Sequence, residues 1–468
     1  MSRVETATLP VVLQHPAVTV YQLRTPELGD STYIVTSAHE AAVVDGQRDV
    51  DRCEAALDLL GVRLVAVLET HVHNDYVTGG PELARLRSAS YIVPRDSGYE
   101  GGRAVFEGDQ IEVGRVHVRP LFTPGHTPHH LSYEIVLGDE VLGVLTGGSV
   151  LVGSVGRSDL ISPDLTDGLT REQYRSAAKI GELPDPAVIG PTHGAGSFCT
   201  SSPASDETWT TVGREKGRNP AFLIRDEDEF VRRQLAGLGA YPAYYAQMAP
   251  INRSGSRPWP QTRLEELSPE RLSGLAAGGA VVVDVRPRLE FALEHLSGAV
   301  NIELDGPLSA YLGWIFPWGT RFVLVASTEQ EAVEAARQAA RIGIDSVQGW
   351  MREGAWKNTD LAVASYRSVD MNKLNIELSG PEQARVLDVR QDSEWSAGHI
   401  PGAVQVPIQN VLAKAPELSL QPGRTYVHCA SGYRSAIAAS ILEASGVEVV
   451  HVDGGFQDWA QNGYPVAL

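Results

Sequence analysis

The feature that most constrains the fold is an internal repeat in the C-terminal half of the chain. The segment Val283–Arg286 recurs as Leu387–Arg390, and the residues that follow match at the same offset of 104 positions. The further matched positions are Glu290 with Glu394, His295 with His399, and Gly298–Val300 with Gly402–Val404. Self-similarity of this kind indicates a duplicated structural unit. Because each copy opens with a short apolar run typical of a buried parallel strand, we expect two tandem α/β domains.

The rest of the chain is long enough for another domain, because 468 residues leave room for about three domains in all. From residue 18 to about residue 189, short β-branched runs alternate with Gly, Pro and Asp, which is typical of layered structure. The polar, proline-interrupted segment Asn252–Pro260 indicates a linker. We therefore predict an α/β and α+β multidomain protein. Its first domain covers 1–250, a linker covers 251–264, and the two repeats cover 265–366 and 367–468.

The composition argues against several classes of partner. The chain carries 39 Lys and Arg residues against 58 Asp and Glu residues, a net charge of −19. This charge opposes binding to phosphate backbones and anionic lipid, so we expect neither nucleic acid nor a membrane as a partner. Three cysteines cannot form a disulfide framework, and the sequence shows neither a secretory leader nor a run of about 18 apolar residues. We therefore expect a cytoplasmic protein.

The second repeat contains a cysteine at a point where a strand passes into a helix. Tyr426–His428 leads into the six residues Cys429–Arg434, and the helical stretch Ser435–Leu442 follows. Such a loop turns backbone N–H groups and a helix N-terminus towards one point, where they favour a thiolate and an anionic persulfide sulfur. The predicted catalytic residues are Cys429 and Arg434, and the predicted substrate-binding residues of the loop are Ala430, Ser431, Gly432 and Tyr433. The alternative is a buried thiol that only fills space.

The motifs around this loop resemble those of a rhodanese (thiosulfate sulfurtransferase) domain over about residues 369–468. The matching segments are Asp388–Arg390, Glu394, Gly398–Ala403 and Cys429–Arg434. Four residues between cysteine and arginine fit a compact sulfane sulfur, whereas related loops one residue longer enclose a phosphate. In the first repeat, the same offset places Val325 opposite Cys429 and Gln330 opposite Arg434. The first copy therefore resembles an inactive rhodanese domain, and we expect it to act as a spacer or a docking surface.

A histidine-rich segment follows an apolar strand in the first domain. Leu64–Leu68 runs into a segment with His71, His73 and Asp75 at alternate positions. Alternate residues of an extended segment share a face, so these three side chains can converge. His126 and His193 each follow an apolar stretch and lie in a turn. The predicted metal ligands are His71, His73, His126, Asp75 and His193.

The order of these segments resembles the metallo-β-lactamase fold, an αββα sandwich with its metal at one edge. The run Gly153–Leu160 is closest to the glyoxalase II and persulfide dioxygenase branch, and the whole chain resembles the persulfide dioxygenase–rhodanese fusions of bacterial sulfide detoxification. Two positions depart from the family pattern. Tyr76 replaces the last histidine of the HxHxDH motif, and Gly148 replaces the aspartate of the TGD motif. What remains is a three-imidazole set, His71, His73 and His126, that could hold one iron or zinc ion; the resemblance favours iron.

The missing carboxylate leaves three functions open for the first domain. A single metal ion, with Asp75 or water in place of the lost ligand, could still support oxidation of a persulfide to sulfite, which is an acceptor for rhodanese transfer. The alternatives are a two-metal hydrolase similar to glyoxalase II and an inert scaffold that serves only the rhodanese domain. The expected partners are a low-molecular-weight thiol persulfide, thiosulfate or sulfite, and the sequence leaves a homo-oligomer open.

Two further residues of the first domain each allow two interpretations. Arg157 could bind a carboxylate of glutathione or a similar thiol, or it could be a structural arginine. Cys199 could relay sulfur, but a buried inert thiol is the favoured interpretation.

Overall fold

The chain divides near residue 260 into two compact units in the computed structural model, which describes residues 9–201, 205–259, 263–380, 384–420 and 423–468. The first unit runs up to this point and also includes Ala340–Gly343, and the remaining residues form the second. Across the described ranges, every helix is too short or too polar to cross a bilayer.

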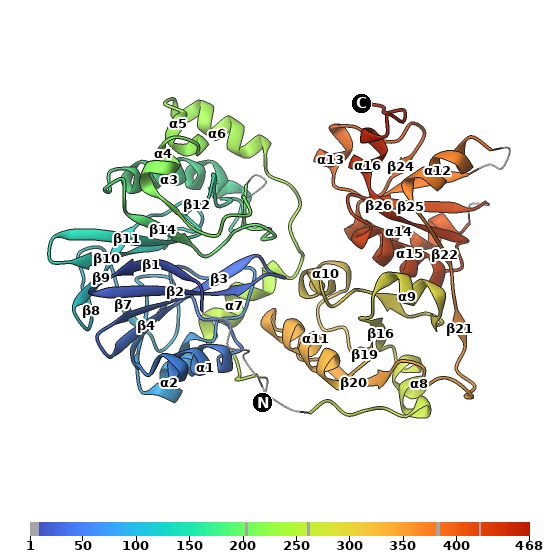
Figure 1. The fold of residues 1–468 in the computed structure, drawn as a ribbon, viewed down its shortest axis with the longest axis horizontal. Helices are drawn as coiled ribbons and strands as arrows, with labels where there is room; N and C mark the ends of the chain where they lie inside the picture. The colour runs from blue at the N-terminus through green and yellow to red at the C-terminus, as the bar shows by residue number, and fades with distance from the viewer. Residues whose placement is uncertain (1–8, 202–204, 260–262, 381–383, 421–422) are drawn as a thin grey trace. The chain divides into compact units, whose positions relative to one another are not determined.

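Two mixed sheets form the centre of the first unit (Figure 1). The first sheet contains, in spatial order, β1 (Val11–His15), β2 (Val18–Thr25), β3 (Asp30–Ser37), β4 (Glu40–Val44), β5 (Arg63–Leu68), β6 (Ser90–Pro94) and β7 (Arg103–Val105). The second contains β15 (Thr210–Thr211), β14 (Val188–Pro191), β11 (Glu140–Gly147), β10 (Leu131–Leu137), β9 (Val116–Phe122) and β8 (Ile111–Val113). A short hairpin, β12 (Val150–Leu151) with β13 (Ser154–Val155), follows β11. Apolar side chains from both sheets, such as Tyr33, Val44 and Tyr133, form one core between them.

Helices cover the outer face of each sheet. The helices α1 (Asp51–Leu60) and α2 (Gly80–Arg87) pack on the first sheet, where Leu57 and Leu83 join a core with Val67. The helices on the second sheet are α3 (Pro163–Gly181), α4 (Val212–Lys216), α5 (Pro220–Leu223) and α6 (Glu227–Ala236). Ala177 and Phe230 from this layer pack against Ile189. Figure 1 shows the resulting order of helix, sheet, sheet and helix, which confirms the predicted αββα sandwich.

The last helix of the first unit, α7 (Tyr245–Ser254), extends into the segment predicted as a linker. The side chain of Asn252 is buried and contacts the histidine loop. Its Oδ1 accepts a hydrogen bond from the Thr78 N–H, and its Nδ2 donates to the carbonyls of His73 and Tyr76. These contacts attach α7 to the histidine loop, so Asn252 has a structural role. Irregular chain begins only after Ser254.

The two repeats form two parallel sheets in the second unit. The first sheet has the order β18 (Val300–Asn301), β16 (Val281–Asp284), β19 (Phe322–Ala326) and β20 (Val347–Arg352). The second has the order β22 (Arg367–Val369), β26 (Val449–Gly455), β25 (Thr425–Cys429), β23 (Arg385–Asp388) and β24 (Val404–Gln405). A short antiparallel pair joins β17 (His295–Leu296) to β21 (Val363–Ala364). The duplication seen in the sequence is therefore a duplication of parallel sheets, although the division of this unit at residue 366 stays a prediction.

Helices flank both parallel sheets. The first repeat contains α8 (Pro269–Ala277), α9 (Arg288–Leu293), α10 (Leu308–Ile315) and α11 (Glu329–Arg341). The second contains α12 (Met371–Leu378), α13 (Asp392–Ser396), α14 (Ile408–Ser419), α15 (Tyr433–Ala444) and α16 (Phe456–Gln461).

The repeated Asp-Val-Arg motif has the same structural role in both copies. Arg286 pairs with Asp284 at 2.7 Å and Arg390 pairs with Asp388 at 2.6 Å, and all four residues are buried. Each arginine also donates to a backbone carbonyl eight residues further along the chain. A buried pair must be this well satisfied to offset the cost of removing two charges from water.

Candidate functional site

The predicted metal ligands gather at one edge of the αββα sandwich, each in a loop that follows a strand. His71, His73 and Asp75 follow β5, His126 follows β9, and His193 follows β14. All five side chains are buried. Two packed sheets therefore bring together residues from distant parts of the sequence.

Three imidazoles, those of His71, His126 and His193, form one candidate metal site. Their ligand atoms lie within 4.8 Å of one another, and the two Nε2 atoms of His71 and His193 are 3.4 Å apart. The other ring nitrogen, Nδ1, has its own partner in each case: Thr70 Oγ1 at 2.8 Å, the Arg157 carbonyl at 2.7 Å and Asp30 Oδ1 at 2.9 Å, respectively. Nε2 of His126 is buried and has no hydrogen-bond partner among the described residues. An outer partner on one ring nitrogen and a free second nitrogen is the usual arrangement of metal-ligating histidines, so this set fits a single metal ion.

The charge of these imidazoles depends on their neighbours. Burial, together with nearby histidines, lowers the pKa of His71 well below its ordinary value and lowers that of His126 to about 3. Burial acts in the same direction on His193, but Asp75 and Asp30 outweigh it and raise the pKa of His193 to about 10. A metal ion would therefore have to displace a proton from His193 alone.

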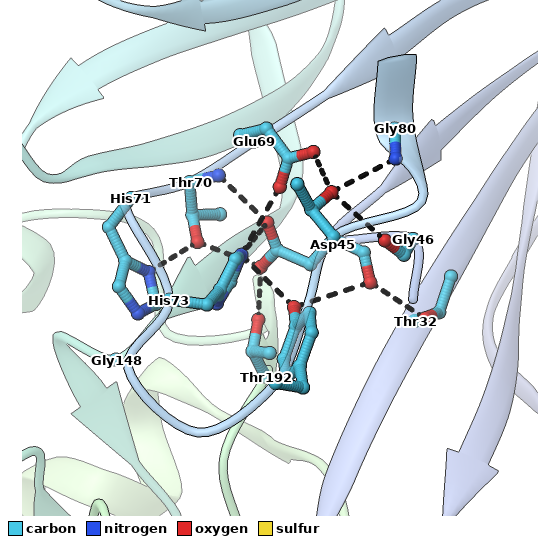
Figure 2. Close-up of polar contacts among 12 residues, drawn as sticks. Thr32, Asp45, Gly46, Glu69, Thr70, His71, His73, Gly80, Gly148 and Thr192 are labelled. Carbon is cyan, nitrogen blue, oxygen red and sulfur yellow. Dashed lines mark hydrogen bonds and ion pairs between the residues drawn. The ribbon is translucent and has the colours of Figure 1, made fainter. Parts of the chain in front are cut away.

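Nε2 of His73 faces an acidic pocket, as Figure 2 shows, whereas its Nδ1 is buried and has no hydrogen-bond partner among the described residues. Its Nε2 lies 3.2 Å from Asp45 Oδ1 and 3.3 Å from Glu69 Oε2, and its ring stacks on Tyr76 with centroids 4.3 Å apart. Burial opposes a charged imidazole, but Asp45 and Glu69 raise the pKa of His73 to about 9. The sequence predicts His71, His73 and His126 as one set, and this grouping stays a prediction. In the structure His193 joins His71 and His126, while His73 neutralises two buried carboxylates and also belongs to a possible set with Asp75 and His193.

We expect this arrangement to make the stability of the first unit depend on pH. A histidine whose pKa is higher in the folded state contributes stability that is fully present below its ordinary value of 6.5. That contribution is lost as the pH rises through about 9. Urea unfolding at pH 6.5 and pH 9.5, monitored by hydrogen exchange of β5 peptides, measures this contribution. Between the two pH values the wild type should lose more free energy of unfolding than His73→Gln. Equal losses would contradict the assignment. At pH 6.5, the variant should also be less stable by about 3 kcal/mol, because it leaves the carboxylates unpaired.

Among the described residues, no carboxylate joins the three imidazoles in one ligand set. Asp75 Oδ2 lies 3.1 Å from Nδ1 of His193, the ring nitrogen that Asp30 also contacts, so Asp75 holds His193 from behind. At Gly148, a Cβ atom would lie 2.2 Å from Cδ2 of His126, so the ring fills the space of a side chain there. A second possible ligand set, His73, Asp75 and His193, shares His193 with the first. The three imidazoles therefore fit one metal ion, and the second set has no histidine ligand of its own besides His73.

Arg157 and Cys199 lie near the site with their polar groups already engaged. The Arg157 guanidinium contacts both carboxylate oxygens of Asp159, at 2.7 and 2.8 Å, and donates to the carbonyls of Phe198 and Gly239. Of its two sequence interpretations, these contacts favour the structural one, and its own carbonyl holds His126. Burial and the charge of Asp75 raise the pKa of Cys199 well above its ordinary value, which favours an inert thiol.

The cysteine loop has the predicted shape. Cys429 ends β25, and Gly432 adopts a left-handed conformation with φ 92° directly before α15. The Gly432 N–H donates to Cys429 Sγ at 3.2 Å, and the thiol lies 3.5 Å from Ser435 Oγ. Although Cys429 is fully buried, its sulfur therefore faces a backbone N–H group and a hydroxyl group. Ser435 was not singled out from the sequence.

Arg434 acts on this loop through a carboxylate. Its two terminal nitrogens contact the two oxygens of Glu394 at 2.6 and 2.7 Å, a bidentate pair. Burial opposes ionisation of Glu394, but Arg434 holds the pKa of this carboxyl below its ordinary value. Arg434 makes no hydrogen bond to the sulfur in the described structure. It brings a positive charge to the loop and, through Glu394, holds α13 in place.

The loop of the first repeat is filled by the protein itself. Backbone pairing sets Asp284 opposite Val325 and Asp388 opposite His428, so Ala326, not Val325, corresponds to Cys429. The offset is therefore one residue smaller here, and Glu331, not Gln330, corresponds to Arg434. The Glu331 carboxylate accepts hydrogen bonds from the N–H groups of Ser327 and Thr328 at 2.9 and 3.1 Å. The loop therefore has no cysteine, and its N–H groups already bind an anion.

Comparison with known proteins agrees with this architecture. The model of the metallo-beta-lactamase superfamily matches residues 24–193, and the rhodanese-like domain model matches residues 268–354 and 372–462. Human persulfide dioxygenase ETHE1 is 30% identical over 206 residues, which are 43% of this chain and 74% of that protein. The chain belongs to the metallo-beta-lactamase superfamily. It combines this domain with two rhodanese-like domains.

Other members of this superfamily match smaller or larger parts of the chain. The human hydroxyacylglutathione hydrolase-like protein is 35% identical over 127 residues, and the chain spans only 41% of that relative's length. A crystal structure described as a metallo-beta-lactamase from Staphylococcus aureus is 25% identical, with a TM-score of 0.65. That structure covers 72% of this chain and is itself covered over 99% of its length. The likeness therefore extends well beyond the metallo-beta-lactamase domain.

Two carboxylates at this metallo-beta-lactamase site were missed by the sequence analysis. Asp45 and Glu69 directly follow β4 and β5, and both are fully buried. Asp45 accepts hydrogen bonds from the Thr70 N–H and from the hydroxyls of Thr70 and Thr192 (Figure 2). An acidic residue placed directly after an apolar strand was the available signal, because a buried carboxylate requires partners.

Proposed function

We propose that this protein is a sulfur-transfer enzyme in which Cys429 carries sulfane sulfur as a persulfide. The observation that carries the proposal is the Gly432 N–H group directed at Cys429 Sγ, at the start of a twelve-residue helix. A backbone N–H donor and the positive end of a helix favour an anionic sulfur. The rhodanese-like relatives of this segment support the same reading.

The reaction consists of two displacements at sulfur. The Cys429 thiolate attacks the sulfane sulfur of thiosulfate, the sulfur–sulfur bond of thiosulfate breaks, and sulfite leaves with the electron pair. The product is a Cys429 persulfide anion held among the N–H groups of the loop. A nucleophile such as cyanide or a thiolate then takes the terminal sulfur and restores the Cys429 thiolate. Ala430 to Tyr433 shape the space around the terminal sulfur, and the Arg434–Glu394 pair supports the loop from one side.

Mass spectrometry of the intact loop peptide tests this proposal directly. After incubation with thiosulfate and rapid alkylation, the peptide containing Cys429 should gain the mass of one sulfur atom, and cyanide should remove it. The peptides containing Cys53 and Cys199 serve as internal controls, because the surroundings of these two thiols raise the pKa of each. Sulfur on all three peptides, or on none, would contradict the proposal.

The second part of the proposed function is metal-dependent oxidation of a thiol persulfide in the first unit. It is supported by the three Nδ1-anchored imidazoles of His71, His126 and His193 and by the similarity to persulfide dioxygenase ETHE1. These residues would hold the metal, and a ferrous ion there would supply the chemistry with O₂ that converts persulfide, O₂ and water into thiol, sulfite and two protons. Sulfite is a sulfur acceptor, so a persulfide on Cys429 could return it to thiosulfate.

Metal analysis and oxygen consumption together test this second part. Protein purified without added metal should contain about one iron per chain and should consume O₂ with glutathione persulfide. Zinc without O₂ consumption would favour a glyoxalase II-like hydrolase instead, and the absence of any metal would favour a scaffold that serves the rhodanese-like domain.

A further inference from the structure

The inactive rhodanese-like repeat contacts the cysteine loop of the active one. The Tyr433 hydroxyl donates to the carbonyl of Glu303 at 3.1 Å. The Tyr433 ring lies against Gly306, where a Cβ atom would be only 2.1 Å from the ring. Tyr311 is buried beside it, with the two ring centroids 5.6 Å apart. A residue of the loop that surrounds the nucleophile is therefore fixed by the other repeat.

Arg288 of the inactive repeat makes a second connection. Glu303 holds Arg288 from two sides, because its carboxylate accepts from the Arg288 backbone N–H and from Nη1, both at 2.7 Å. Nε of Arg288 then donates to Asp453 Oδ1 of the active repeat at 2.8 Å. We call Arg288, Glu303 and Gly306 the loop seat.

Asp453 and Arg288 also lie beside Gly432, the residue whose N–H group faces the thiol. A Cβ atom on Gly432 would lie 2.6 Å from Asp453 Oδ1 and 3.2 Å from Nε of Arg288, so the ion pair closes one side of Gly432. On another side, the Gly432 carbonyl is 3.0 Å from His451 Nε2 and accepts from Ser435 Oγ at 3.0 Å. These contacts hold the Gly432 Cα and carbonyl in place, and the N–H of the same residue donates to Cys429 Sγ.

We propose that the first rhodanese-like repeat is a positioning element of the sulfur-transfer site, and that Arg288 sets the direction of the Gly432 N–H through Asp453. This inference rests on the proposed function of Cys429 and extends it. The repeat that lost its own nucleophile is then neither a spacer nor a docking surface, because it supplies one wall of the working site.

The test compares Arg288→Met with Arg288→Lys and with Arg271→Met, a control in the exposed part of α8. The first measurement is the rate of Cys429 alkylation by iodoacetamide as a function of pH, read from the loop peptide. The second is kcat/KM for sulfur transfer from thiosulfate to cyanide. We expect Arg288→Met to move the alkylation profile to higher pH and to lower kcat/KM about tenfold. Arg288→Lys should recover part of both effects, and Arg271→Met should match the wild type.

A second substitution covers the case in which Arg288→Met does not fold. Tyr433→Phe removes only the hydroxyl bond to Glu303 and should shift the alkylation profile in the same direction. An alkylation profile and a kcat/KM equal to the wild type in a folded Arg288→Met, or an unchanged profile in Tyr433→Phe, would overturn the inference. If the wild type itself transferred no sulfur, the proposed function would fail. The alkylation profiles of the variants would still decide whether the loop seat positions the Cys429 thiol.

Discussion

Replacing Cys429 by serine abolishes the formation of thiocyanate from thiosulfate and cyanide and leaves the metal content of the first unit unchanged. A serine hydroxyl is not ionised near neutral pH and cannot form the persulfide that links the two displacements. The side chain is nearly isosteric, and Ser435 Oγ and the Gly432 N–H remain as its neighbours, so the fold of the loop should persist. The measurement is a colorimetric thiocyanate assay together with a thermal melt.

Cys199→Ser is the matched control for this experiment. Cys199 is as fully buried as Cys429, but it lies in the other unit, beside Tyr245. Its substitution should leave the rate of thiocyanate formation at the wild-type level. Residual activity in Cys429→Ser, combined with a loss of activity in Cys199→Ser, would show that Cys429 is not the sulfur carrier.

Alanine at His71, His126 or His193 empties the metal site, whereas alanine at His73 leaves it filled. Three protein ligands are the minimum for a tight site of this kind, so the loss of one imidazole should remove most of the metal, whether iron or zinc. His73 contacts Asp45 and Glu69, so His73→Ala should reduce stability without releasing metal. Elemental analysis of each purified variant, with exposed His39→Ala as a control, makes the comparison.

This comparison separates the structural ligand set from the one that the sequence spacing suggests. If His73→Ala lost its metal and His193→Ala kept it, the site would consist of His71, His73 and His126. Full metal in all four variants would place the ion elsewhere in the chain.

Much of the fold could be predicted from local pattern and repetition. The 104-residue offset predicted the duplicated parallel sheets, because a buried strand and its turn are encoded by short contiguous segments. The order of the histidine segments predicted the αββα sandwich through its resemblance to a known fold. The offset failed only beyond β18, where the first repeat is one residue longer, and this placed Val325 where Ala326 lies.

The composition of the candidate sites could be predicted only in part. Alternation along the chain showed that His71 and His73 can share a face, but it could not show that Asp45, from the loop after β4, binds Nε2 of His73. The bidentate contact between Arg434 and Glu394 joins residues forty positions apart. Side-chain partners of this kind depend on tertiary packing and leave no spacing signal in the sequence.

The carboxylate of Glu331 has a consequence for the first repeat. A cysteine restored at Ala326 would meet a loop whose N–H groups already serve a resident negative charge, and that charge would repel a thiolate. A cysteine alone would therefore not give this loop a working thiolate, because the resident carboxylate of Glu331 would have to be replaced as well.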